Sequence, residues 1–128
     1  MLHAQHDAYQ AVQATTADPS RVIILLFDGA ERFLHQAQQG LDRGDIAAFS
    51  YMLSRAHAVV GELSSAVDQE TGGDVARNLA RLYTFMLGHL TQGLIAKSRT
   101  HLEQVLGLLK QLREGFEGAL ETTRRESA

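Results

Sequence analysis

The feature that most constrains the fold of this chain is a helical spacing of apolar residues that occurs in four separate stretches. In each stretch apolar side chains return every three or four residues, as they do along one face of an α-helix. Apolar and polar residues do not alternate with a period of two over any length, so strands are not expected. Proline occurs only once, at Pro19. Short connections favour antiparallel neighbours around one core. The sequence therefore predicts an all-α fold: an antiparallel four-helix bundle with a short N-terminal segment packed on it.

Capping residues mark the limits of the four helices. Asp and Ser side chains accept hydrogen bonds from first-turn amides, proline fits the first helical position, and glycine ends a helix at low cost. The predicted markers are Asp18, Pro19, Gly44, Asp45, Asp74 and Ser98. The predicted core faces are Val22, Leu26, Ala30, Phe33, Ala37 and Leu41; Ile46, Phe49, Leu53, Ala56, Val60, Leu63 and Val67; Val75, Leu79, Leu82, Tyr83, Met86 and Leu90; and Leu102, Val105, Leu106, Leu109, Leu112, Phe116 and Leu120.

These markers divide the chain into one domain and two ends. Residues 18–120 form the predicted bundle. Residues 1–17 are expected to be a flexible segment or a short helix that docks on it. Residues 121–128 are polar and are expected to be a disordered tail.

Composition narrows the class of protein. The 128 residues carry a net charge of −3, so the chain lacks the excess of basic residues that is typical of nucleic-acid-binding proteins. No cysteine is present, so disulfides and thiolate chemistry are excluded. The longest apolar run, residues 22–27, is far shorter than the roughly 20 residues of a membrane span. The N-terminus lacks a secretory pattern. We therefore expect a cytoplasmic protein without membrane insertion.

Metal and cofactor sites are not expected. A di-iron bundle requires Glu-x-x-His on two helices, and this motif does not occur. His3 and His6 are best explained as a chance pair in a tail. No phosphate-binding glycine loop and no oriented nucleophile is evident, so the prediction is a protein without enzymatic activity, cofactor or metal.

Histidine phosphotransfer remains an alternative, because such domains are also helical bundles. They present one exposed histidine, usually with a lysine three residues later and a glycine after that. His57 is followed by Gly61, but Val60 replaces the lysine that would pair with the phosphate. A histidine at the boundary of a helix face explains the pattern better.

Several large apolar residues fall outside the predicted core faces. They are Ile24, Leu25, Tyr51, Phe85 and Ile95. Single exposed apolar residues are ordinary, and a wide buried face is the simpler explanation. If they lie on neighbouring helices, they could form a groove for an amphipathic helix of a partner. A structural or oligomeric bundle without a specific partner is the third possibility.

The order of several short motifs resembles the flagellar secretion chaperone FliS family over residues 8–117. Each motif is weak alone, but their order and spacing are specific. The motifs are Tyr9, TADP (16–19), IILLFDGA (23–30), GDI (44–46), GDVARNL (73–79), LYTFM (82–86) and LEQVLGLL (102–109).

This resemblance implies a cytoplasmic chaperone for newly made flagellin. Such proteins bind the disordered C-terminal segment of flagellin, prevent premature polymerisation and deliver the client to the type III export gate; a homodimer is possible. Tyr9 is the candidate for contacts with the gate or for docking the N-terminal segment. The candidates for the client surface are Ile24, Leu25, Asp28, Asn78, Tyr83 and Phe85.

Overall fold

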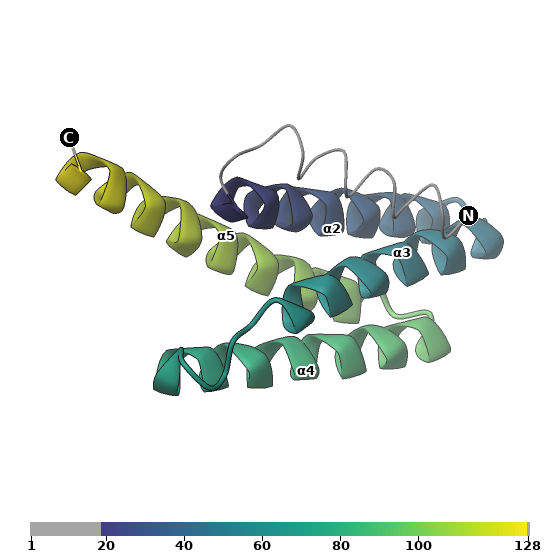
Figure 1. Ribbon diagram of the computed structural model, residues 1–128. Coiled ribbons are helices and arrows are strands. Elements are labelled where there is room, and N and C mark those ends of the chain that lie inside the picture. Colours follow the sequence, from purple (N-terminus) through teal and green to yellow (C-terminus); the bar gives the residue numbers. More distant parts are fainter. Residues whose placement is uncertain (1–18, 128) are drawn as a thin grey trace, which may run out of the picture.

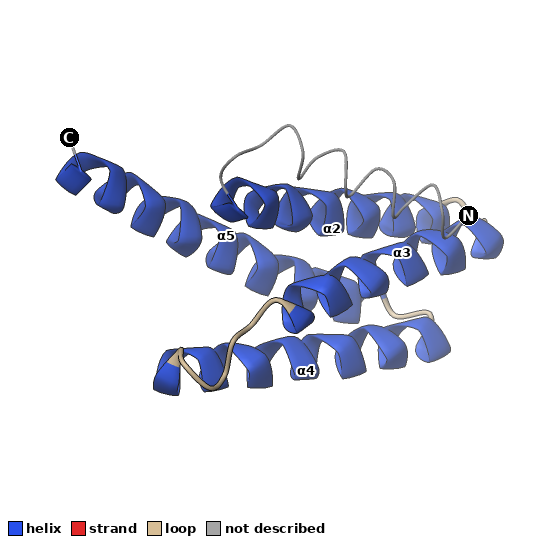
Figure 2. Ribbon diagram, in the orientation of Figure 1, coloured by secondary structure: helices blue, strands red, loops and turns tan. Residues whose placement is uncertain are grey.

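The computed structural model describes residues 19–127, which form four helices and their connections (Figure 1). The helices are α2 (Pro19–Asp42), α3 (Ile46–Ser65), α4 (Gly73–Ala96) and α5 (Arg99–Ser127). Figure 2 shows that the described chain is helical apart from three connections. The prediction of an all-α fold is confirmed.

Each helix packs against two others and runs antiparallel to both. The neighbouring pairs are α2 with α3, α3 with α4, α4 with α5, and α2 with α5. In the diagonal pairs, α2 with α4 and α3 with α5, no two Cα atoms of the described residues lie within 8 Å of each other, so these helices are not neighbours. The four helices therefore surround one core, and α2 and α4 present their outward faces on opposite sides of it (Figure 1).

Two of the predicted caps are present as expected. Asp45 Oδ1 accepts a hydrogen bond from the Ala48 amide at 3.1 Å and caps α3. Ser98 Oγ accepts from the His101 amide at 3.3 Å at the start of α5. Gly44 has a φ of 74°, the left-handed conformation predicted for the residue that ends α2. These short turns hold α2 to α3 and α4 to α5 at the same end of the bundle (Figure 1).

The prediction that Asp74 caps α4 is wrong. The helix begins at Gly73, two residues earlier than this cap would place it, its N-cap is Gly72, and no side chain caps it. Asp74 lies inside the first turn and pairs with Arg77. Asp68 in the preceding connection accepts hydrogen bonds from the amides of Glu70 and Thr71 and from the Thr71 hydroxyl. The hydrogen bonds from Thr71 lower the pKa of the Asp68 carboxyl.

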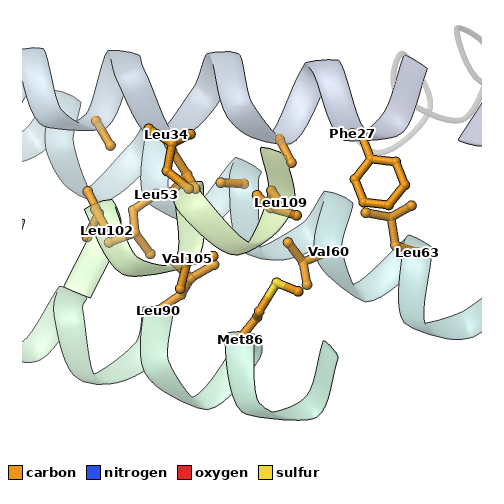
Figure 3. Packing of buried hydrophobic residues seen from close by; sticks show 14 of the residues in the cluster. Phe27, Leu34, Leu53, Val60, Leu63, Met86, Leu90, Leu102, Val105 and Leu109 are labelled. Atoms are coloured by element: carbon orange, nitrogen blue, oxygen red, sulfur yellow. The ribbon is translucent and has the colours of Figure 1, made fainter. Parts of the chain in front are cut away.

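The core draws large apolar side chains from all four helices (Figure 3). Because interiors are packed as densely as organic crystals, these residues account for most of the free energy that holds the bundle together. Those almost wholly removed from solvent are Phe27, Leu34, Phe49, Leu53, Val60, Leu63, Met86, Leu90, Leu102, Val105 and Leu109.

The core differs from the prediction on three helices. On α2, the predicted Val22, Ala30 and Ala37 are buried. Phe27 and Leu34 are buried in place of Leu26 and Phe33, which are only partly buried.

On α3, Ile46 is the first helical residue, next to the α2–α3 connection, and is 39% exposed rather than buried. On α4, Val75 lies in the first turn and is 78% exposed. The adjacent Ala76 is buried in its place.

The C-terminal end of α5 also differs from the expected disordered tail. The helix continues past residue 120 to Ser127 (Figure 2). Glu121 forms ion pairs with Arg124 and Arg125 at helical spacing, and both arginines lie in the last turn, where cations favour the helix dipole. Residues 122–127 are exposed, as their polar sequence predicts.

Candidate functional site

The predicted surplus of apolar residues is present on the surface. Leu25 is 46% exposed, Tyr51 45%, Phe85 51% and Ile95 78%. Ile24 is half-buried. The core is complete without these side chains, so they are available to a partner at no cost to folding.

Three candidates lie on α2. Ile24 and Leu25 lie in its first two turns. Asp28, one turn later, is exposed, and its Oδ1 lies 3.6 Å from Arg113 Nε of α5. The stronger partner of Arg113 is Glu31, which accepts from Arg113 Nε at 2.6 Å and is only 7% exposed. The hydrogen bonds to Glu31 raise the pKa of the Arg113 guanidinium, so this ion pair fixes α5 against α2.

The other three candidates lie on α4 and are not equivalent. Asn78 is exposed, and Phe85 is exposed with its ring stacked on His89, with 5.0 Å between ring centroids. Tyr83 is 2% exposed and belongs to the core cluster. Its burial raises the pKa of the phenol to about 12. Tyr83 can therefore support a binding surface from beneath but does not form one.

The structure does not bring the candidates into one site. Because α2 and α4 are diagonal in the bundle, the group on α2 and the group on α4 occupy separate surfaces. The possibility of one groove formed by these candidates on neighbouring helices is therefore not supported. The candidates form two separate patches: Ile24, Leu25 and Asp28 on α2, and Asn78 and Phe85 on α4. Tyr9 lies outside the described residues.

Two side-chain clusters were not anticipated from the sequence. On the α4–α5 seam, His89 stacks on His101 at 4.2 Å between centroids and is hydrogen-bonded to Gln104. On α3, Arg55 lies over the Phe33 and Tyr51 rings and donates to the Tyr51 hydroxyl at 2.9 Å. The spacing of four between Phe85 and His89, and between Tyr51 and Arg55, was the available local signal.

His57 lies in an unfavourable place for phosphotransfer. It is half-buried and lines a hollow of about 210 Å³ between α3 and α4. The other lining residues are Leu53, Ser54, Thr91 and Leu94. A phosphate on His57 would find no lysine or arginine among these described neighbours, so the geometry gives the alternative no support.

Residues 19–127 contain neither a metal site nor a membrane-spanning helix. No group of three or more His, Asp or Glu side chains there is arranged to hold a metal ion. None of the described helices is long and apolar enough to cross a membrane.

The fold is a four-helix bundle that exposes several large apolar side chains on its surface. Comparison with known proteins then identifies its family. The family profile described as "Flagellar protein FliS" matches residues 1–123, and the chain belongs to this family. It is 36% identical to the flagellar secretion chaperone FliS of Salmonella typhimurium, over 89% of this chain and 84% of that protein. It is 33% identical to the flagellar secretion chaperone FliSB of Pseudomonas aeruginosa, over 83% and 84%.

The fold has a counterpart among solved structures. A crystal structure described as that of a flagellar chaperone from bacteria superposes with a TM-score of 0.76, covering 92% of this chain and 98% of that one at 16% identity. The family match confirms the predicted family and the role as a flagellar export chaperone, and the superposition confirms the fold class.

Proposed function

We propose that this chain binds the C-terminal segment of flagellin in the cytoplasm, prevents it from polymerising and passes it to the flagellar export gate. The names of the relatives in the FliS family support the role in flagellar secretion. The observation that carries the proposal for this chain is the exposure of Leu25, Tyr51 and Phe85 outside a complete core. Apolar side chains in such positions suit the apolar stripe of an amphipathic helix.

The proposed mechanism is coupled folding and binding. A disordered client segment has an apolar stripe that would otherwise meet other flagellin copies. Ordering the segment costs several kcal/mol, so its affinity stays moderate for the area buried. A moderate affinity suits a client that must be released later. Binding and handover alone account for this role, and the proposal includes no enzymatic step.

The separation of the two patches bears on how the client is held. Ile24, Leu25 and Asp28 on α2 would contact one part of the segment, and Asn78 and Phe85 on α4 another. A single client segment that contacts both patches must run around the bundle, because α2 and α4 are not neighbours. Tyr9 is retained as the proposed contact with the export gate.

Calorimetric titration with the C-terminal flagellin segment from the same organism tests the proposal. We expect one-to-one binding with a negative heat-capacity change, the signature of apolar burial, and no binding to an N-terminal flagellin fragment. Leu25→Ser and Phe85→Ser should each weaken binding. Ile46→Ser is the matched control, since Ile46 is exposed but lies at the α2–α3 turn. A folded, helical chain that binds neither fragment would contradict the proposal.

A further inference from the structure

A basic hollow lies beside the connection between α3 and α4. Its volume is about 330 Å³, and it is lined by Gln69 of the connection and by Arg77, Ala80, Arg81 and Thr84 of α4. The space is sufficient for a carboxylate and the side chain that carries it. None of the residues assigned above to the client surface lines this hollow.

The two arginines face the hollow from successive turns of α4, because residues four apart share a helix face. Arg77 pairs with Asp74, and both side chains of this pair are at least half exposed, so solvent weakens it. Arg81 is exposed and has no ion-pair partner among residues 19–127. The Thr84 hydroxyl already donates to the Ala80 carbonyl at 2.9 Å. The donors left for a ligand are therefore the guanidinium groups and the Gln69 amide, which select an anion.

The surroundings favour an acidic side chain on a partner over a free ion. Residues 82–96 contain no Asp, Glu, Lys or Arg, so Arg81 borders a stretch of α4 without formal charge. Phe85 follows Arg81 by one turn and is 51% exposed. A cation next to an exposed aromatic ring complements a helix that carries a carboxylate beside its apolar stripe.

We infer that Arg81, assisted by Arg77, binds a carboxylate side chain of the client segment, one helical turn away from an apolar residue that contacts Phe85. This inference rests on the proposed function and adds to it the chemistry of one contact. Arg81 holds the carboxylate through the planar fork of its guanidinium, and the amide of Gln69, which also lines the hollow, can donate to the same group. The contact sets the register of the client on α4.

A double-mutant cycle tests this contact. The affinity of the flagellin C-terminal segment is measured for the wild-type chain and for Arg81→Gln, with each acidic residue of the segment changed in turn to its amide. Arg81→Gln should weaken binding about twofold to fivefold, the range expected for a partly solvated ion pair. One acidic position should cause a similar loss alone and little further loss in the Arg81→Gln background.

Arg43→Gln is the matched control, because it removes the same charge from an exposed arginine in the α2–α3 turn. Arg43→Gln should leave affinity unchanged, while Arg81→Lys, which keeps the charge but loses the fork, should show an intermediate loss. Equal affinities of the wild-type, Arg81→Gln and Arg43→Gln chains would overturn the carboxylate site and leave the proposed function standing. A wild-type chain that fails to bind the segment would overturn both.

A second experiment distinguishes binding of a client carboxylate from binding of a free anion in this hollow. Client binding is compared in phosphate and in chloride at equal ionic strength. Competition by phosphate that depends on Arg81, without coupling to any acidic position of the client, would show a site for inorganic anions and overturn the inference. Coupling to one acidic position supports it in either salt.

Discussion

The two ends of the bundle are built differently. At the closed end, the turns at residues 43–45 and 97–98 hold the helices in pairs, and Gly40 and Gly93 allow close approach of the chain. A Cβ at Gly40 would lie 2.8 Å from the Phe49 nitrogen. At the open end, the longer connection at residues 66–72 joins α3 to α4, and α5 extends beyond the other helices (Figure 1).

Packing follows the same division. Among the described residues of α5, none after Leu109 is fully buried. Phe116 is half-buried, and its ring lies 6.3 Å from that of Phe27 between centroids. The basic hollow at Arg81 also lies on the side of the residue 66–72 connection. The first half of α5 is thus packed into the core, whereas its second half, toward the open end, is only partly buried.

The largest expected difference between the ends comes from two leucines of α5. Leu102 is wholly buried near the closed end, so Leu102→Ala should lower the free energy of unfolding by about 2–5 kcal/mol. Leu112 is half-buried further along the helix, and Leu112→Ala should cost only about 1 kcal/mol. Urea denaturation measures both. Equal losses would mean that the two ends are packed alike.

Adding one methyl group at each of two glycines of α4 compares a tightly packed position with an open one. A Cβ at Gly93 would lie 2.9 Å from the His101 Cβ and 3.1 Å from Leu102 Cδ1. Gly93→Ala should therefore destabilise the chain by about 1–3 kcal/mol. Gly88, in the same helix, has open space, and Gly88→Ala should stabilise it by about 0.5–1 kcal/mol. Thermal unfolding that moves in the same direction for both variants would contradict the close contact at Gly93.

The Glu31–Arg113 ion pair is the main polar contact between α2 and the second half of α5. Glu31→Ala leaves Arg113 without its closest partner, and we expect a loss of about 1–2 kcal/mol after allowance for partial solvent exposure. Glu121→Ala is the control, since it breaks exposed pairs near the C-terminus and should cost less than about 0.5 kcal/mol. Urea midpoints that rank the two variants in the opposite order would show that this contact is not structural.

The pH dependence of the folding stability tests how tightly Tyr83 is packed in the first half of α4. Its folded pKa of about 12 lies above the usual value of 10.0, so the neutral phenol favours the folded state. The contribution is complete below pH 10 and is lost as pH rises through about 12. At pH 11 the wild-type chain should have lost about 1 kcal/mol more than Tyr83→Phe, relative to neutral pH. Parallel pH profiles for the two chains would contradict the burial of this hydroxyl.

Local patterns were sufficient for the helices and most of the core, because helical period and capping act within a few residues. They failed on α2, where both Phe33 and Leu34 are apolar and only contacts with α3 and α5 decide which is buried. Ion pairs such as Glu31 with Arg113 join helices that are far apart in the sequence, so no local spacing of residues predicts them. The same limit explains why the sequence left open whether Leu25 and Phe85 lie on neighbouring helices, and the structure places them on α2 and α4, which are not neighbours.

The most direct test of client binding to the outward faces is NMR mapping of backbone amides during titration with the flagellin C-terminal segment. We predict shifts concentrated around Leu25 and around Arg81 and Phe85, with the amides of Leu90 and Leu102 at the closed end little changed. Saturation with the segment that shifts only closed-end core amides, or that shifts none, would contradict a client held on the outward faces of α2 and α4.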